Sequence, residues 1–128
     1  MNINDKNNEY YAETKEKLGN TNEYKEYEEK SKSRTKQEFE NINDKLMNVF
    51  TELGTLRYLS VEDEKVQEKV EKLKKFITDN YYTCTNEILY SLGQMYVNDE
   101  RFKNNIDKVA GEGTAKFVSE AISVYCSK

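Results

Sequence analysis

Apolar side chains recur at gaps of three and four residues between Phe39 and Ile77. This spacing places them on one face of an α-helix and predicts two successive helices. The first pattern extends through Leu56 to Leu59. The two apolar stripes are Phe39, Ile42, Leu46, Val49, Phe50 and Leu53, and then Val66, Val70, Leu73, Phe76 and Ile77.

Capping signatures precede both stripes. Thr35 is followed three residues later by Glu38, and Ser60 is followed three residues later by Asp63. A hydroxyl residue with an acidic residue at this distance is typical of a helix start, because each side chain can bind the other's backbone N–H. We therefore expect Thr35 and Ser60 to begin the two helices, and the second helix to end near Asn80.

The last third of the chain contains three further helical stripes, separated by short joints. Thr85 is expected to cap the first after a joint at residues 81–84, and Asn98-Asp99 to separate it from the second. Gly111-Glu112-Gly113 is expected to end the second stripe, and Thr114 to cap the last helix. The apolar positions are Ile88, Leu89, Leu92, Met95 and Tyr96; Phe102, Ile106 and Val109; and Ala115, Phe117, Val118, Ala121, Ile122, Val124 and Tyr125.

Residues 1–38 contain few sizeable apolar side chains. These are Tyr10, Tyr11, Leu18, Tyr24 and Tyr27. Thr21 is expected to cap a helix after a break at Gly19-Asn20. Ordering a backbone costs about 1–2 kcal/mol per residue, which so few anchors can scarcely offset. We predict a loosely ordered, mobile helical arm over residues 1–38 and a helical core over residues 39–128.

Composition supports one all-α domain of five to seven helices in a bundle-like or globin-like arrangement. The 128 residues contain no proline and five glycines, whereas sandwiches and barrels need many turns. The net charge is −4 with both signs interspersed, so no basic face predicts nucleic-acid binding. No apolar segment has the length of a membrane span or the position of a signal peptide, which favours a cytoplasmic protein with reduced thiols.

The absence of histidine excludes several kinds of chemistry. The chain contains no Ser–His or Cys–His pair, no histidine general base and no imidazole for zinc or haem. Cys84 and Cys126 are far apart in sequence and make a poor metal site. We therefore predict a binding domain rather than an enzyme, without cofactor or metal.

Tyrosines are the first candidates for a binding surface. Tyr81, Tyr82, Tyr90, Tyr96 and Tyr125 crowd one part of the sequence. A buried tyrosine needs a hydrogen-bond partner, and drug-sized pockets combine aromatic walls with a few polar groups. Core packing is the alternative for each of these tyrosines and for Met95 beside Tyr96.

Cys84 is a second candidate because it directly precedes the expected cap Thr85. The partial positive charge at a helix N-terminus favours a thiolate, which would be reactive if exposed. The alternative is a small buried apolar side chain, the usual role of a free cysteine.

Several motifs in the chain are shared with one known family. They are the runs Tyr81 to Leu89 and Leu92 to Phe102, then Asn105-Ile106-Asp107, Gly113-Thr114-Ala115 and Ala121-Ile122, with Gly19-Asn20-Thr21, Tyr24, Thr35-Lys36 and Phe39 upstream. In these motifs the chain resembles the TipAS antibiotic-recognition domain from about Tyr10 to Cys126. Two positions depart from the family: Leu18 replaces a tryptophan, which removes one stacking surface, and Asn86 replaces a proline.

The resemblance implies a globin-like helical fold without haem. It implies the effector-binding half of a MerR-type transcription activator, or a stand-alone version that sequesters the drug. Thiopeptides or other bulky apolar antibiotics would bind in a cleft that the N-terminal arm closes. DNA would be contacted only through a helix-turn-helix domain, which this sequence does not contain, and a homodimer is expected only in the full-length context.

The expected cleft is lined by Tyr81, Tyr82, Met95, Tyr96 and Phe102, and Tyr24, Tyr27 and Phe39 close it from the arm. In some family members a cysteine bonds covalently to a dehydroalanine of the drug, and Cys84 occupies a motif position that would supply it. Two other hypotheses stay open. One is a helical interaction or dimerisation module without a small ligand, and the other is a thiol enzyme that uses Cys84 with a lysine or tyrosine base.

Overall fold

A computed structural model describes residues 22–128 of the chain, so the expectations for Leu18, Gly19-Asn20 and Thr21 fall outside it. The described residues form six helices and no strand, which confirms the predicted all-α class. The helices are α2 (Asn22–Ser31), α3 (Lys36–Thr55), α4 (Glu64–Asn80), α5 (Asn86–Asn98), α6 (Glu100–Ala110) and α7 (Thr114–Cys126).

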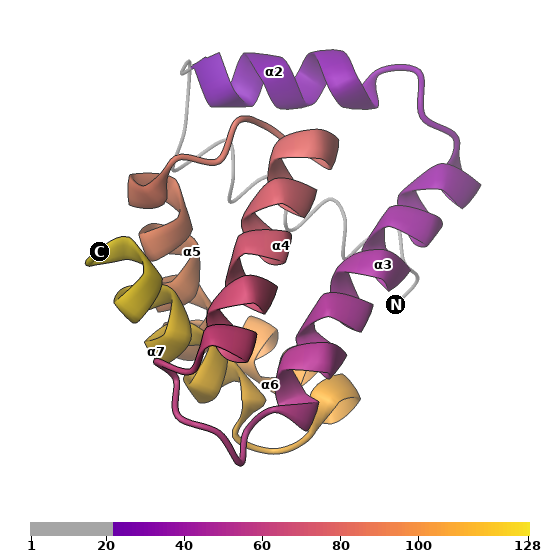
Figure 1. The fold of residues 1–128 in the computed structure, drawn as a ribbon. Helices are drawn as coiled ribbons and strands as arrows, with labels where there is room; N and C mark the ends of the chain where they lie inside the picture. Colours follow the sequence, from indigo (N-terminus) through magenta and orange to yellow (C-terminus); the bar gives the residue numbers. More distant parts are fainter. Residues whose placement is uncertain (1–21) are drawn as a thin grey trace.

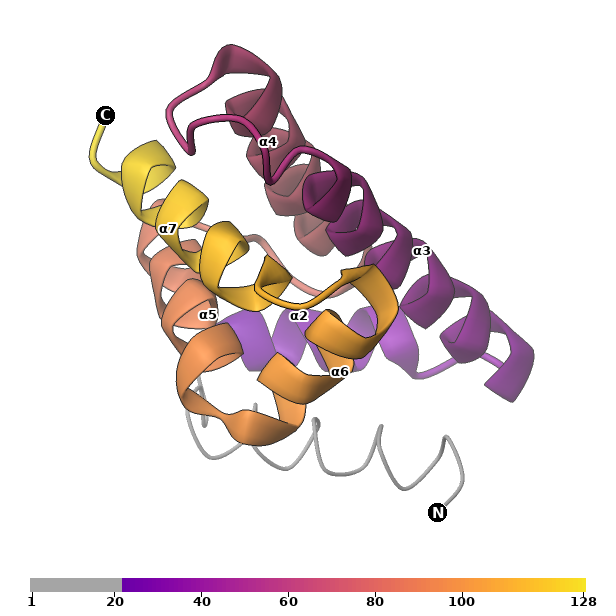
Figure 2. The ribbon, with the colours of Figure 1, turned by 90° about the horizontal axis from the view of Figure 1, so that it is seen from below.

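Helices α3 to α7 pack directly against one another, whereas α2 lies across one end of this bundle (Figure 1). It crosses the C-terminal end of α4 and the joint that leads to α5. Helix α6 contacts α3, α5 and α7 at the other end of the bundle, as the view from below shows (Figure 2). This arrangement gives the bundle one end that is covered by a single, separately attached helix.

The core consists of the apolar stripes that the sequence indicates. Its fully buried members include Leu53, Val66, Val70, Leu73, Leu89, Ala115, Val118, Ala121 and Ile122. Two glycines allow helices to approach closely. A Cβ on Gly54 would lie 2.4 Å from the carbonyl oxygen of Ala110, and one on Gly93 would lie 3.1 Å from Cγ2 of Ile122. These positions bring α3 against α6 and α5 against α7.

Three of the predicted helix starts are confirmed. The Thr35 hydroxyl accepts the N–H of Glu38 at 3.1 Å, and the Thr85 hydroxyl accepts the N–H of Ile88 at 3.2 Å. The Asp99 carboxylate accepts the N–H of Arg101 at 3.0 Å, so the chain restarts where expected. Each side chain satisfies a backbone donor that has no partner inside its helix.

Two helix boundaries differ from the prediction between α3 and α4. Helix α3 ends at Thr55, and the backbone turns at Leu56 instead of continuing to Leu59. Asp63, not Ser60, caps α4 by accepting the N–H of Lys65 at 2.9 Å. The Ser60 hydroxyl accepts the N–H of Glu62 at 3.1 Å and so organises the preceding turn.

The start of α7 also differs, because Thr114 is its first helical residue rather than its cap. Gly113 is the N-cap, with a φ of 89° that favours glycine. The buried Thr114 hydroxyl donates to the carbonyl oxygen of Ala110 at 3.2 Å. The carboxylate of Asp107 on α6 accepts the N–H of Ala115 at 2.9 Å, and so it takes over the capping role from the neighbouring helix.

The described part of the predicted arm, residues 22–38, contains α2 and the first turn of α3. The expected division at residues 38 and 39 therefore falls inside α3. Tyr24 and Tyr27 of α2 are buried, with 8% and 7% of their surfaces exposed. These two tyrosines of the arm are thus buried in this structure, and Tyr27 belongs to the core cluster.

Candidate functional site

A cavity of about 310 Å³ lies between α3 and α6, and Tyr27 of α2 is among its lining residues. This volume falls at the lower end of the roughly 300–1,000 Å³ that small-molecule sites occupy. Helix α3 lines it with Phe39, Ile42, Asn43, Leu46, Met47 and Phe50. Helix α6 lines it with Arg101, Phe102, Asn105, Ile106, Lys108 and Val109. The remaining lining residues are Tyr27 of α2, Arg34 of the following loop, Tyr81 of the α4–α5 joint and Tyr96 of α5.

Helical spacing explains how α3 forms one wall. Its lining positions recur at gaps of one, three and four residues, which places them on one face of the helix. Phe50 is fully buried at the deep end of that face, whereas Phe39, Ile42 and Leu46 are only half-buried. The same stripe therefore supplies core packing at one end of α3 and cavity wall at the other.

Aromatic rings form two contact groups around the cavity. Phe50 and Tyr96 meet edge to face with centroids 5.2 Å apart, and Phe102 lies 6.5 Å from Tyr96. Tyr27 stacks on Tyr81 at 5.8 Å. Such contacts add about 0.5–1.5 kcal/mol per pair beyond area burial. The walls are therefore rigid aromatic surfaces, which suit a flat apolar ligand.

Tyr81 presents an uncharged hydroxyl. Burial raises the pKa of the Tyr81 phenol above its usual 10.0, and the nearby Tyr27 raises it further, while Arg34 acts in the opposite direction. The phenol consequently stays neutral across the physiological pH range. It can donate or accept a hydrogen bond but cannot act as a base there.

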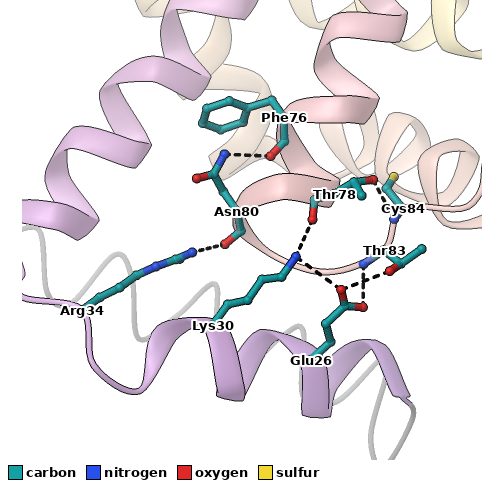
Figure 3. A network of polar contacts seen from close by, with 8 residues as sticks. All are labelled: Glu26, Lys30, Arg34, Phe76, Thr78, Asn80, Thr83 and Cys84. Carbon is teal, nitrogen blue, oxygen red and sulfur yellow. Dashed lines mark hydrogen bonds and ion pairs between the residues drawn. The ribbon is translucent and has the colours of Figure 1, made fainter.

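A polar network attaches α2 to the bundle (Figure 3). The Glu26 carboxylate accepts the Thr83 N–H at 2.8 Å and the Thr83 hydroxyl at 3.0 Å. It also lies 3.3 Å from the Lys30 ammonium, and Lys30 donates to the carbonyl oxygen of Thr78 at 2.5 Å. We call these contacts, together with the Arg34 contact described next, the α2 latch.

Arg34 lies between α2 and α3, and its Nη2 donates to the carbonyl oxygen of Asn80 at 2.5 Å (Figure 3). Lys30 and Arg34 thus place two positive charges at the C-terminal end of α4, where the helix dipole is negative. The other terminal nitrogen of Arg34, Nη1, is buried and has no hydrogen-bond partner among the described residues.

The structure brings together five of the nine expected binding residues. Tyr27, Phe39, Tyr81, Tyr96 and Phe102 line the cavity, and Tyr24, Tyr82, Cys84 and Met95 do not. The latter four are buried core residues, with Tyr82 and Cys84 each 2% exposed. Sequence reasoning missed the α3 face beyond Phe39 and the polar residues Arg34, Asn43, Arg101, Asn105 and Lys108. The helical period could have identified the α3 face, but nothing in the sequence singles out Arg34.

The surroundings of Cys84 favour the protonated thiol over the expected thiolate. Burial raises the pKa of the Cys84 thiol from 9.0 to about 12, and only the nearby Lys74 opposes this. The Sγ atom lies 3.7 Å from the carbonyl oxygen of Thr85, and the backbone N–H donates to the Thr78 hydroxyl. Desolvation therefore outweighs the helix N-terminus, and Cys84 is the small buried side chain of the alternative interpretation.

Metal ligation has no basis in residues 22–128, where no group of three or more cysteine, aspartate or glutamate side chains could hold an ion. Cys84 and Cys126 are both free thiols. No helix in the same residues is long and apolar enough to cross a membrane.

The geometry defines a class: an all-helical domain with an aromatic cavity that one separately attached helix helps to line. The sequence model of the TipAS antibiotic-recognition domain matches residues 10–125. The chain belongs to this family.

Relatives place the domain within longer proteins. The chain is 34% identical over 121 residues to the HTH-type transcriptional activator TipA of Streptomyces coelicolor, covering 89% of this chain and 46% of that protein. It is 28% identical over 116 residues to the HTH-type transcriptional activator mta of Bacillus subtilis, covering 91% and 45%. The chain thus spans about half the length of these relatives.

A solved structure shares the fold. It is that of TipAS from Streptomyces lividans in complex with nosiheptide, described as part of a thiopeptide antibiotic multidrug resistance system. The TM-score is 0.79 at 32% sequence identity, and the match covers 94% of this chain and 85% of that chain. The predicted globin-like helical arrangement without strands is therefore that of a known drug-binding domain.

Proposed function

We propose that this chain is a drug-binding effector domain, in which the cavity between α3 and α6 captures an aromatic, largely apolar molecule. The observation that supports it most directly is the cavity itself, with aromatic side chains from α2, α3, α5, α6 and the α4–α5 joint around one space. The family and the nosiheptide complex of TipAS support the same function. The domain would act by binding rather than by catalysis, in the cytoplasm.

We propose that ligand binding is coupled to the position of α2. Tyr27 of α2 and Arg34 of the following loop contribute to the lining, so a ligand would contact both the bundle and its cover. With α2 in its present position, the cavity of about 310 Å³ would hold a small aromatic molecule. A bulky thiopeptide would require α2 to move outward. Ligand contact would then stabilise the closed position, since a ligand shifts an equilibrium toward the state that it binds better.

Relatives that carry this domain are transcription activators, and we propose that the drug signal here serves the same kind of switch or sequesters the drug directly. Binding is expected to be noncovalent, because the Cys84 thiol is buried and protonated. DNA contact is proposed to fall to another domain of a longer protein, since the relatives are HTH-type transcriptional activators of which this chain covers about half.

A cavity-filling variant tests the proposal. In Asn43→Trp an indole enters the space from α3, and the affinity for the uncharged fluorescent probe N-phenylnaphthylamine should fall about ten-fold or more. Asn48→Trp is the matched control, because the same substitution falls on an exposed position of the same helix. Circular dichroism verifies that both variants fold.

The possible results of this experiment lead to different conclusions. Loss of probe binding in Asn43→Trp but not in Asn48→Trp supports the cavity as the site. Failure of the wild-type chain to bind the probe or nosiheptide would overturn the proposal. Equal binding by both variants would place the ligand elsewhere.

A further inference from the structure

Among the described residues that line the cavity, the charged side chains are all positive, although the chain as a whole is acidic. The net charge of the chain is −4. The cavity is nevertheless lined by the cations Arg34, Arg101 and Lys108, and no aspartate or glutamate is among its described lining residues. Asn43 and Asn105 add amide groups that can donate hydrogen bonds. The charged groups among the described lining residues are therefore all hydrogen-bond donors.

Arg34 is the most informative of these residues. Its Nη2 donates a hydrogen bond to the carbonyl oxygen of Asn80, and this contact orients the guanidinium group. The other terminal nitrogen, Nη1, is buried and has no hydrogen-bond partner among the described residues. Leaving a buried charged donor unpaired costs more than the net gain of an ordinary hydrogen bond. A ligand oxygen that accepts from Nη1 would remove this cost.

Arg101 differs from Arg34 because its charge is partly compensated. Its guanidinium lies 2.9 Å from the Asp99 carboxylate, and the side chain is half exposed. Lys108 is also exposed. These two cations contribute to the potential at the cavity, whereas Arg34 provides an oriented donor next to the stacked Tyr27 and Tyr81 rings.

We infer that the cavity selects aromatic ligands that carry an acidic group, with the ring among the aromatic walls and the anion on Arg34. This inference rests on the proposed function and names the ligand class of the same site. A planar guanidinium is suited to an oxyanion, and charge-assisted hydrogen bonds are about twice as strong as neutral ones. The bound anion would also hold Arg34 in place and so favour the closed position of α2.

The test uses two probes that share one aromatic framework. Anilinonaphthalene sulfonate carries an acidic group, and N-phenylnaphthylamine is its uncharged parent. The wild-type chain should bind the sulfonate about ten-fold or more tightly than the parent, after correction for the intrinsic fluorescence of each. Arg34→Gln should remove most of that difference. Because it also removes one contact of the α2 latch, it should weaken binding of the uncharged parent no more than Lys30→Gln does, and it should weaken binding of the sulfonate about ten-fold beyond that.

Two control variants separate direct recognition from other effects. Lys75→Gln removes the same unit charge at an exposed site outside the cavity, and it should leave both affinities unchanged. Lys30→Gln loosens the α2 latch without altering the lining, so it should affect both probes equally.

Each remaining result overturns one proposal. Equal loss of both probes in Arg34→Gln, reproduced by Lys30→Gln, would mean that Arg34 only attaches α2, and the inference fails. Equal binding of the two probes by the wild-type chain would also overturn it, with the cavity still established as a site. Binding of neither probe would instead count against the proposed function.

Discussion

Helix α2 and the α5–α7 pair are held in place by different forces. Residues of α5 and α7 such as Leu89, Ala121 and Ile122 are fully buried. Among the described contacts of helix α2 are two buried tyrosines and the polar α2 latch. Exposed ion pairs contribute only about 0–1 kcal/mol each, whereas full burial of a large aliphatic side chain contributes about 1.5–3 kcal/mol.

This difference indicates which part of the molecule can move. Local opening occurs where few apolar contacts must be broken. Among the described residues, the helix pairs that pack most closely lie within α3 to α7, and Tyr27 is the α2 residue in the core cluster, so departure of α2 would break few apolar contacts of the described core. We therefore expect α3 to α7 to carry most of the stability of the domain, and α2 to be the part that moves to admit a ligand.

The largest expected effect concerns Cys84, which lies at the end of the joint between α4 and α5. A pKa of about 12 instead of 9.0 means about a thousand-fold less thiolate at neutral pH. In a Cys126→Ser variant, Cys84 should react with iodoacetamide at least a hundred-fold more slowly than free cysteine. Mass spectrometry at timed intervals measures the rate.

The alkylation result also bears on the closed state of α2. A rate near that of free cysteine would show that the α4–α5 joint opens freely, and it would reopen covalent capture at Cys84. The reciprocal Cys84→Ser variant reports Cys126, which is only half-buried and should react faster.

The next effect is on the bundle. Leu89→Ala should lower the free energy of unfolding by about 3 kcal/mol, because it removes buried methyl groups and leaves a cavity between helices. Ile88→Ala is the matched control, since the neighbouring side chain is only half-buried and should cost about 1 kcal/mol.

Urea denaturation followed by circular dichroism measures both losses, and the slope with urea should stay unchanged. Equal losses for Leu89→Ala and Ile88→Ala would contradict the burial gradient across α5. A small loss in both would mean that the core is less tightly packed than the structure indicates.

The bundle could be predicted from the sequence because local signals and tertiary packing agree there. The periodic stripes identified α3 to α7, and the hydroxyl caps Thr35 and Thr85 were read correctly. Prediction was wrong at Ser60 and Thr114. A competing turn decided the first boundary, and a cap from Asp107 of the preceding helix decided the second. Capping chemistry alone cannot distinguish such cases, because the same side chain can bind several nearby backbone groups.

The cavity was less predictable. Some tyrosines line the cavity and others lie in the core. Tyr81 and Tyr82 are neighbours in sequence, yet Tyr81 lines the cavity and Tyr82 is buried in the core. Which of two adjacent side chains faces a space depends on the path of an irregular joint, which has no period. Arg34 depends on contacts 46 residues away in the sequence and carried no local signal.

The smallest expected effect is on the α2 latch. Glu26→Gln keeps the shape of the side chain but removes the charge that Thr83 and Lys30 contact. The amide hydrogens of α2 should exchange a few-fold faster, because such exposed contacts contribute little individually. Amides of α5 and α7 should be unaffected. Faster exchange throughout the bundle would contradict the separate attachment of α2.

Lowering the pH also removes the negative charge of Glu26, without a mutation. The Thr83 N–H holds the pKa of the Glu26 carboxyl below its ordinary 4.5. Burial opposes this, and hydrogen bonds from the Thr83 hydroxyl and from Lys30 lower the pKa further. A carboxyl whose folded pKa is lowered stabilises the structure above its unfolded pKa, and that stabilisation is lost as the pH falls through the lowered value. The Thr83 amide resonance should therefore titrate with a midpoint below 4.5 in the wild-type chain and lose that titration in Glu26→Gln. A midpoint at or above 4.5 would mean that α2 is already detached at neutral pH, and the contrast between the latch and the bundle would then be greater than the structure shows.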